Sequence, residues 1–548
     1  MYFLRRIKDA LSPAALIVAV SCFGAALTPS LMPRDPFVQA TLAAVAAVLG
    51  YEAALLARTL WRYLELPEAG RLKRAWLVAA IAVSAGIMLY SLSKAASWQN
   101  ATREAVGLAP LDSAAPFFIF GVGGGLALGL WFCFRIAGMV RRLISVFLER
   151  LLPRRIGIVL SVALVGWLFW ALVDGAFVRT AFKAADASFL AADMLIEPDV
   201  DKPEDPMKTG SAASLVRWEE MGRRGREYVA TAPTREEISE FFEGAVQDPV
   251  RVYVGRRSAD TAEERADLAL RELIRVGGFD RSALIVVVPP GTGWMDPGAH
   301  DTIDFMLGGD VATVSVQYSY LTSVLSLLSH PDYGVAQARA LFEKVYDHWT
   351  EMPKDSRPDL YVHGLSQGAF NSQATLPLLD MLGDPIQGAM WTGSPFFSRF
   401  WSEVRDQRNP GSPAWRPTYG NGSLVRVLDQ YGGLDGDFAP WAPIRAVFLN
   451  YGSDPIVNFT FDSAIRPPAW MEAPRAPDVS DKFSWFPVVT MLQLALDSLF
   501  ALDVPRFGHY YIAPDYIDAW AALVEPDGWS EDRARHLKAI FEERGPPL

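Results

Sequence analysis

Ser366 has the sequence surroundings of an activated nucleophile. It lies in Gly364-Leu365-Ser366-Gln367-Gly368, after the apolar run 360–362 and before the small-residue segment 369–374. A strand, a sharp turn and a helix form the setting that holds a serine hydroxyl out into a cleft, and the flanking glycines leave room for the tight turn. The alternative interpretation is a small residue in an ordinary turn.

A serine hydroxyl is a weak nucleophile at neutral pH, so it needs a base and an acid that orients the base. His509 is the predicted base, because it stands in the glycine-bearing loop Arg506-Phe507-Gly508-His509-Tyr510-Tyr511 near the C-terminus. Asp454 is the predicted acid, because it follows the apolar run 447–449 in a turn. The chain order serine, aspartate, histidine is the order expected after a nucleophile elbow. A turn or helix-capping aspartate before Pro455 is the alternative for Asp454.

Backbone N–H donors for a developing oxyanion are expected from two loops. One donor is Gln367, which directly follows the nucleophile, and the other is Thr292, Gly293 or Trp294, after the apolar run 283–288. A plain turn is the alternative for the second loop. Four further side chains are predicted to line an apolar substrate pocket, or else to belong to the core: Tyr318, Tyr320, His363 and Trp391.

The segments that must position these residues alternate between strands and helices. Amphipathic segments predict helices at 262–276, 335–349 and 367–382. This alternation is typical of a mostly parallel sheet with helices on both faces. The strands are predicted from short, apolar, β-branched runs at 250–254, 283–288, 311–316, 360–363, 387–391 and 444–449.

The first third of the chain is much more apolar than the rest. A cleaved signal peptide is an alternative for its first block, but no cleavage site is evident after it. Glycines four apart in the fourth block suit close helix packing in lipid. Five blocks have about the length that crosses a bilayer as a helix: 11–31, 37–57, 75–92, 114–134 and 156–178.

Basic residues predict the orientation of these spans. Most Lys and Arg residues of the region lie before the first block, between the second and third, or between the fourth and fifth. The opposite connections contain only Arg34, Lys94 and Arg103. Because basic residues favour the cytoplasmic side, we expect a multi-pass protein of the cytoplasmic membrane, with a cytoplasmic N-terminus and everything after residue 178 outside.

Charge and cysteine content exclude several classes of function. Residues 1–178 have 17 basic and 9 acidic side chains, whereas the whole chain has a net charge of −11, so the later region is strongly acidic. Such a region does not suit nucleic acid, whose phosphates need Lys and Arg. The two cysteines, Cys22 and Cys133, lie within predicted spans, so neither a cysteine nucleophile nor a cysteine metal site is expected outside the membrane. We predict no metal and no other cofactor.

These patterns divide the chain into a transmembrane region at 1–178, a linker at 179–248 and a catalytic region at 249–548. The linker is expected to be extended over the acidic, proline-rich stretch 196–206, with a short helix near 219–229. Two long insertions, 395–441 and 459–507, interrupt the catalytic region and are long enough to act as lids. The second contains the apolar stretch 484–496, which is too short to span a membrane. We expect a buried core helix there, with a lid or a lipid-contacting helix as alternatives.

Several linked motifs give the chain a family resemblance: Arg251-Val252-Tyr253-Val254-Gly255, Gly291-Thr292-Gly293-Trp294, Gln317-Tyr318-Ser319-Tyr320, Gly364-Leu365-Ser366-Gln367-Gly368, Ser453-Asp454-Pro455-Ile456-Val457 and Gly508-His509-Tyr510. From about Arg251 to its end, the chain resembles the bacterial membrane-associated α/β-hydrolase family. In that family a multi-span N-terminal region precedes an extracytoplasmic serine-hydrolase domain, and the N-terminal blocks look similar too. The resemblance implies an α/β-hydrolase fold and an esterase- or lipase-like activity. The elbow has Leu365 and Gln367 where many hydrolases have His or Glu and a small or apolar residue.

The resulting hypothesis is a serine esterase at the outer face of the membrane, acting on a lipid or acylated envelope compound. Ser366 attacks the carbonyl, His509 takes and returns the proton, and Asp454 orients the imidazole. The expected partners are then the lipid bilayer, which anchors the protein, and a lipid or acylated small-molecule substrate. An acyltransferase with the same three residues and a catalytically inactive membrane scaffold or sensor are the alternatives.

Overall fold

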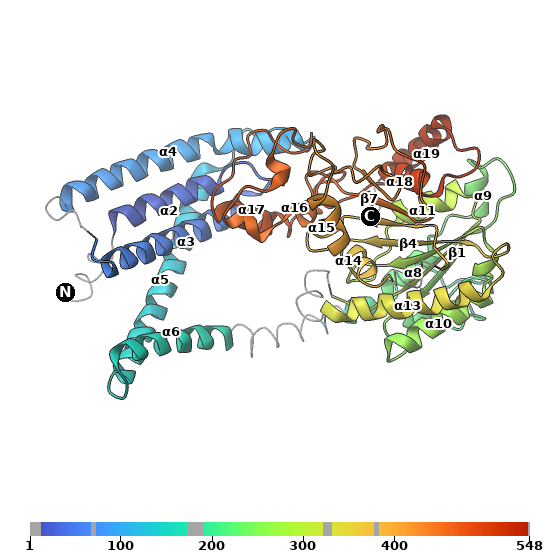
Figure 1. Cartoon of the computed structure of the whole chain (residues 1–548), viewed down its shortest axis with the longest axis horizontal. Helices are drawn as coiled ribbons and strands as arrows, with labels where there is room; N and C mark the ends of the chain where they lie inside the picture. Colours follow the sequence, from blue (N-terminus) through green and yellow to red (C-terminus); the bar gives the residue numbers. More distant parts are fainter. Residues whose placement is uncertain are drawn as a thin grey trace. The chain divides into compact units, whose positions relative to one another are not determined.

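The computed structural model of the chain describes residues 12–66, 73–171, 188, 190–321, 331–376 and 383–545. These residues form two compact units (Figure 1). The N-terminal unit consists of Met1–Arg179 together with Phe459–Ala501, and the second unit consists of Thr180–Asn458 together with Leu502–Leu548. Most of the predicted insertion at 459–507 therefore belongs to the N-terminal unit.

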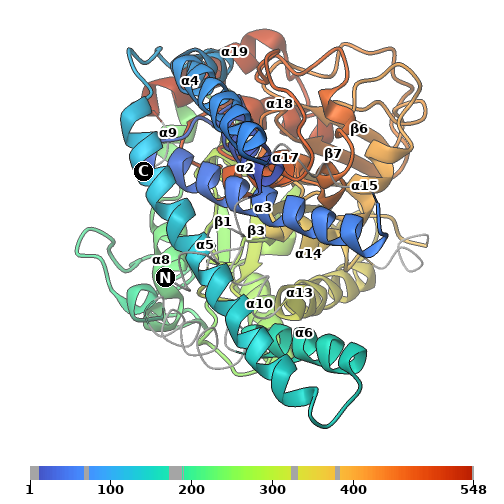
Figure 2. The same ribbon diagram turned by 90° about the vertical axis from the view of Figure 1, so that its left-hand side faces the viewer.

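The N-terminal unit is helical. Helix α2 packs on α3 and α4, and α5 packs on α3 and α6. Figure 2 shows α2, α3 and α17 side by side, as Figure 1 does. The bounds are α2 Pro13–Ala26, α3 Pro36–Tyr63, α4 Lys73–Ala105, α5 Pro116–Leu148, α6 Arg154–Trp170 and α17 Val489–Asp497.

Three helices in the described part of this unit are long and apolar enough to cross a membrane: α3, α4 over Ala75–Ala105, and α5. The other two predicted spans differ. Helix α2 has only 14 residues, because Pro29 follows its last turn and disfavours helical backbone before it. Helix α6 has 17 residues, and 172–178 lie outside the described residues. The expected number of spans was five, and the helices support three by length and composition.

A seven-stranded sheet forms the centre of the second unit. All its strand pairs are parallel, in the order β1-β3-β2-β4-β5-β7-β6. β2 consists entirely of buried apolar residues, as expected for a strand covered on both faces. The strands are β1 Val250–Val254, β2 Ala283–Val288, β3 Val311–Val316, β4 Asp359–Leu365, β5 Gly388–Thr392, β6 Val425–Leu428 and β7 Arg445–Leu449.

Helices cover both faces of this sheet, as predicted (Figure 1). Local sequence fixes several helix starts: a capping box of Thr261 and Glu264 begins α10, and Asp296 with Pro297 begins α11. The predicted helix 367–382 is shorter than expected, although 377–382 lie outside the described residues. The bounds are α8 Gly222–Ala230, α9 Arg235–Ser239, α10 Ala262–Arg275, α11 Pro297–Met306, α13 Pro331–Glu351, α14 Gln367–Gln373, α15 Arg399–Asp406, α16 Pro455–Asn458, α18 Ala513–Val524 and α19 Glu531–Arg544.

The predicted linker is largely part of the second unit's core. Val216, Trp218, Met221 and Tyr228 are buried in the same apolar cluster as the sheet. Their apolar side chains are scattered among polar residues without a regular period, so the sequence pattern did not reveal them. The expectation that 179–248 is only a linker is therefore wrong for its second half, whereas the short helix expected near 219–229 is confirmed as α8.

The two predicted insertions also differ from simple lids. The first, 395–441, contains α15 and β6, and β6 extends the sheet beside β7. The second contains α17, which packs on α2 and α3 as a core helix of the N-terminal unit. A lid role for the remaining parts of both insertions stays a prediction.

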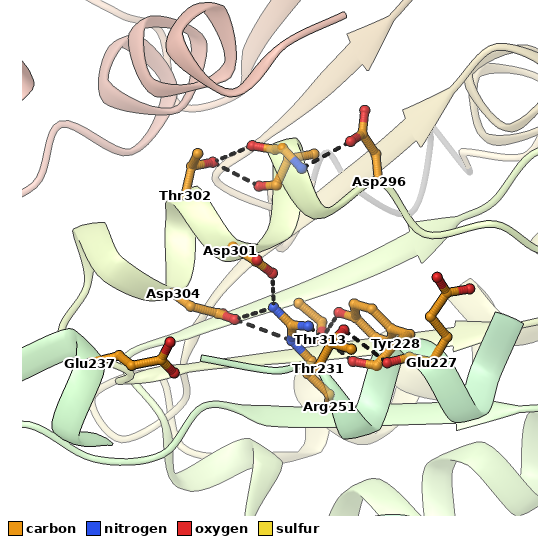
Figure 3. Close-up of polar contacts among 12 residues, drawn as sticks. Glu227, Tyr228, Thr231, Glu237, Arg251, Asp296, Asp301, Thr302, Asp304 and Thr313 are labelled. Carbon is orange, nitrogen blue, oxygen red and sulfur yellow. Dashed lines mark hydrogen bonds and ion pairs between the residues drawn. The ribbon is translucent and has the colours of Figure 1, made fainter. Parts of the chain in front are cut away.

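A buried arginine ties three elements of the second unit together (Figure 3). Arg251 of β1 donates through Nη2 to Asp301 and Asp304 of α11, at 2.6 Å in both cases. Its Nη1 donates to the Tyr228 carbonyl of α8 at 3.0 Å. Arg251 and Asp304 are almost fully buried, so their charges depend on each other rather than on water.

Replacing Arg251 with methionine is therefore expected to destabilise the second unit by about 3–5 kcal/mol, because two buried carboxylates lose their partner. Denaturant unfolding of the purified full-length protein, followed by tryptophan fluorescence, measures the effect. The matched control is Arg271→Met, which breaks the exposed ion pair with Asp267 and is expected to cost about 0.5 kcal/mol or less. Equal losses of unfolding free energy in the two variants would contradict the stabilising role of the buried Arg251.

Candidate active site

Ser366 stands on a strained turn between β4 and α14. Its backbone has φ 57° and ψ −123°, which a residue with a side chain rarely adopts. The two flanking glycines are required sterically. A Cβ on Gly364 would lie 2.6 Å from the Gly368 carbonyl oxygen, and one on Gly368 would lie 1.9 Å from the Val288 carbonyl oxygen. The motif therefore has the geometry of a nucleophile elbow.

The ends of neighbouring parallel strands bring the other site loops to this turn. Leu365 of β4 pairs with Thr392 of β5, which pairs with Leu449 of β7. The Ser366 amide donates to the Thr392 carbonyl at 2.9 Å. The loop that follows β7 carries Asp454, so the serine and the acid leave the same edge of the sheet.

Asp454 and His509 form a buried hydrogen-bonded pair. His509 Nδ1 lies 2.6 Å from Asp454 Oδ2. The other carboxylate oxygen, Oδ1, accepts the amides of Ile456 and Val457 at 2.8 and 3.3 Å. These amides belong to α16, so the carboxylate caps that helix and is held in one orientation toward the imidazole. The helix-capping interpretation of Asp454 is confirmed, and its catalytic role stays a prediction.

The remaining ring nitrogen of His509 is buried and has no hydrogen-bond partner among the described residues. The ring lies against Gly393, since a Cβ there would be 2.4 Å from His509 Cε1. Gly393 directly follows Thr392, which accepts the Ser366 amide. The imidazole therefore lies over the strand end next to the elbow, with Nε2 available to accept a proton.

The predicted oxyanion loop follows β2 and forms a turn with an internal backbone hydrogen bond. The Gly293 amide donates to the Pro290 carbonyl at 2.9 Å, and its φ of +77° needs glycine. The Gly293 N–H therefore bonds within its own loop, and its role as an oxyanion donor stays a prediction. Thr292, Trp294 and Gln367 stay predictions.

Two of the predicted substrate-lining residues are core residues instead. His363 of β4 is buried among His300 of α11 and Tyr516 and Trp520 of α18, and its Nδ1 lies 3.1 Å from the Met390 carbonyl. Trp391 of β5 is buried on the other side, where its Nε1 donates to Ser372 Oγ at 2.9 Å. The two side chains lie on opposite faces of the sheet, and each packs against the helices that cover its face.

Tyr318 is also buried, and burial raises the pKa of its phenol. Tyr320 is half-buried. Both follow β3, at the same sheet edge as the elbow. Their contact with substrate stays a prediction.

The buried histidine gives a pH prediction. Burial lowers the pKa of His363 from 6.5 to about 4. As pH falls, His363 therefore becomes protonated near pH 6.5 in the unfolded chain but only near pH 4 in the folded protein. The stability from a neutral His363 is complete above pH 6.5 and is lost as pH falls, by about 1.4 kcal/mol per pH unit and about 3 kcal/mol in all.

The difference in unfolding free energy between the natural protein and His363→Gln, measured from pH 7 to pH 4, isolates this effect. The comparison is needed because burial raises the pKa of Asp296 to about 7, and that group contributes with the opposite sign. A difference that does not vary with pH over this range would contradict the prediction.

Sequence reasoning missed two residues of the site. The Tyr511 hydroxyl donates to Asp454 Oδ2 at 2.7 Å, which adds a second donor beside the imidazole. Gly393 leaves the space that the His509 ring fills. Tyr511 lies two residues after the predicted base, so the loop containing it was recognised, but no local signal shows where its hydroxyl points.

Comparison with known families identifies the fold. A family model described as "Alpha/beta-hydrolase family" matches residues 250–537, more than half of the chain. This chain belongs to the α/β-hydrolase family. A companion model described as "Alpha/beta-hydrolase family N-terminus" matches residues 27–233 of this α/β-hydrolase, which include helices α3 to α6 and the start of the second unit's core. Together they confirm the family resemblance seen in the sequence.

Among solved structures, the α/β-hydrolase matches Trichoderma reesei cutinase in complex with a C11Y4 phosphonate inhibitor. The sequences are 13% identical, the match covers 43% of this chain and 86% of the cutinase chain, and the TM-score is 0.20. At that TM-score the similarity supports no inference about this chain. No curated protein matches it.

Proposed function

We propose that this α/β-hydrolase is a membrane-anchored serine esterase that cleaves an ester of a lipid or acylated envelope compound. The observation that supports this most strongly is the hydrogen bond between His509 Nδ1 and Asp454 Oδ2 beside a strained Ser366 turn. With Nδ1–H bonded to the carboxylate, the lone pair of the imidazole lies on Nε2. That is the tautomer that accepts a proton from a serine hydroxyl.

The proposed reaction proceeds in two acyl-transfer steps. Ser366 Oγ attacks the ester carbonyl while His509 Nε2 takes its proton, and Asp454 stabilises the imidazolium. Backbone amides, that of Gln367 first among them, bind the oxyanion. His509 then protonates the leaving alcohol, and water activated by the same imidazole hydrolyses the acyl-enzyme.

Three apolar helices support membrane association. Basic residues between α3 and α4, and after α5, support a cytoplasmic location for these connections. A catalytic unit on the outer side of the cytoplasmic membrane then requires the predicted span 156–178, of which α6 is the described part. This topology would bring the site to esters of the outer leaflet or the envelope.

A fluorophosphonate probe tests the proposal, because it reacts with an activated serine and not with a serine in an ordinary turn. The intact protein in detergent or nanodiscs is expected to label at Ser366, identified by peptide mass spectrometry, and to hydrolyse p-nitrophenyl esters. Product analysis with an added alcohol acceptor separates hydrolysis from acyl transfer. A folded protein that neither labels nor turns over esters would favour the inactive scaffold.

A further inference from the structure

Helix α17 buries its polar side chains and exposes apolar ones, which is the reverse of the pattern in a helix that faces water. Its polar side chains Thr490, Gln493 and Asp497 lie on one face, and all three are fully buried. In a helix at a water-facing surface, such residues lie outward and the apolar ones inward. The arrangement in α17 is typical of a helix whose outer side faces lipid instead of water.

The buried polar face of α17 is held by the N-terminal helices of the same unit. Asp497 Oδ1 accepts Arg34 Nε at 2.8 Å, and Asp497 Oδ2 accepts the Leu31 amide at 3.1 Å. Gln493 Nε2 donates to the Thr28 carbonyl at 3.2 Å. All these partners lie in the connection between α2 and α3 or at its edge. Paired, inward-facing charges are what a membrane environment demands of ionisable side chains.

The outward face of α17 is apolar. Ala495 of the helix is exposed, and so are Val488, directly before the helix, and Leu499, two residues after it, at 41% and 62%. Met491 and Leu492 are half-exposed beside them, and no charged residue occurs from 486 to 496. Lys, Arg or Glu would be expected on such a face in water.

The position of α17 within its unit agrees with this reading. Val489 is buried in one apolar cluster with Leu42, Ala43 and Ala46 of α3. α3 has the same inverted arrangement, with Gln39 buried and Phe37 and Leu56 exposed. Helix α17 thus shares its apolar core with a helix that is long and apolar enough to cross a membrane.

We propose that α17 is embedded in the bilayer as a re-entrant helix, with the face of Val488, Ala495 and Leu499 in contact with lipid acyl chains. A nine-residue helix is too short to cross, so its ends need partners within the protein. Those partners are present: the Val488 amide, before the helix, donates to the Ala464 carbonyl at 2.9 Å. At the other end, the Leu496 and Asp497 carbonyls accept the Leu499 and Phe500 amides at 3.0 Å. The segment joining Asp454 to His509 in sequence is thereby anchored in lipid.

The test uses single-cysteine variants of the full-length protein in nanodiscs, with Cys22 and Cys133 replaced by alanine. Val488→Cys, Ala495→Cys and Leu499→Cys are each labelled with NBD. Leu128→Cys, on the exposed face of α5, is the lipid control, and Asp355→Cys, in an exposed turn of the second unit, is the water control. Quenching is measured with doxyl-labelled phosphatidylcholine and with iodide.

Labels on α17 are expected to lose as much fluorescence to the doxyl lipid as the label at Leu128, and to resist iodide. Quenching by iodide like that of the Asp355 label would overturn the proposal, and so would shielding from both quenchers, which indicates a protein partner. Variants are compared only if their melting temperature and gel-filtration profile match the parent. The readout needs no enzymatic activity, so it is independent of the proposed esterase function.

Discussion

Ester hydrolysis is expected to fall by about 10⁴- to 10⁶-fold in kcat when Ser366 is replaced by alanine, because the whole acyl-transfer route depends on its hydroxyl. The substitution removes only one oxygen from a turn whose glycines set the backbone, so the fold is expected to persist. Steady-state hydrolysis of a p-nitrophenyl ester and fluorophosphonate labelling measure the effect together.

Ser372→Ala is the matched control, because Ser372 is a second buried serine in the same helix region, with its hydroxyl bonded to backbone carbonyls and to Trp391. It is expected to retain labelling. A Ser366→Ala protein with activity within tenfold of the natural protein would refute the nucleophile assignment.

Asp454→Asn is expected to lower kcat by about 10⁴-fold through the histidine tautomer. Oδ1 accepts two backbone amides, so in the variant the carbonyl oxygen keeps that position and the NH₂ group takes the place of Oδ2. That NH₂ donates to His509 Nδ1, which must then carry the lone pair. The proton moves to Nε2, and Nε2 no longer accepts the serine proton.

Tyr511→Phe is the control for this substitution. It removes the other donor to Asp454 Oδ2 but keeps the carboxylate and the imidazole bond, so a loss of about tenfold is expected. Rates are compared across pH, since an inverted tautomer lowers kcat at every pH rather than shifting the profile. An Asp454→Asn protein as active as Tyr511→Phe would show that the carboxylate does not set the tautomer.

Much of the fold follows from short sequence patterns. The strands β1, β2 and β3 were predicted to the residue. β2 has an apolar residue at each position, as a strand buried on both faces does, and β1 alternates as a strand does. β6 was missed, since four residues that include the half-exposed Arg426 carry too little pattern. Val216 and Trp218 were assigned to a linker because a core contribution made by isolated residues has no period.

The second insertion is a stronger example of core contacts that no local sequence pattern reveals. Its apolar stretch was expected as a buried core helix, and one face of α17 is buried, but in the core of the N-terminal helices. Arg34 and Asp497 are 463 residues apart in the chain. Nothing local to either residue indicates that the other is its partner.

The sequence by itself determined the elbow at Ser366, the order of the three candidate catalytic residues and the alternation of strands and helices. These depend on backbone sterics and on side-chain periodicity, which act over a few neighbouring residues. Only the tertiary structure decided that Asp454 bonds His509, that His363 and Trp391 belong to the core, and that α17 packs with α2 and α3. Such contacts arise from the register of parallel strands and the packing of whole helices, which join residues that no local pattern relates.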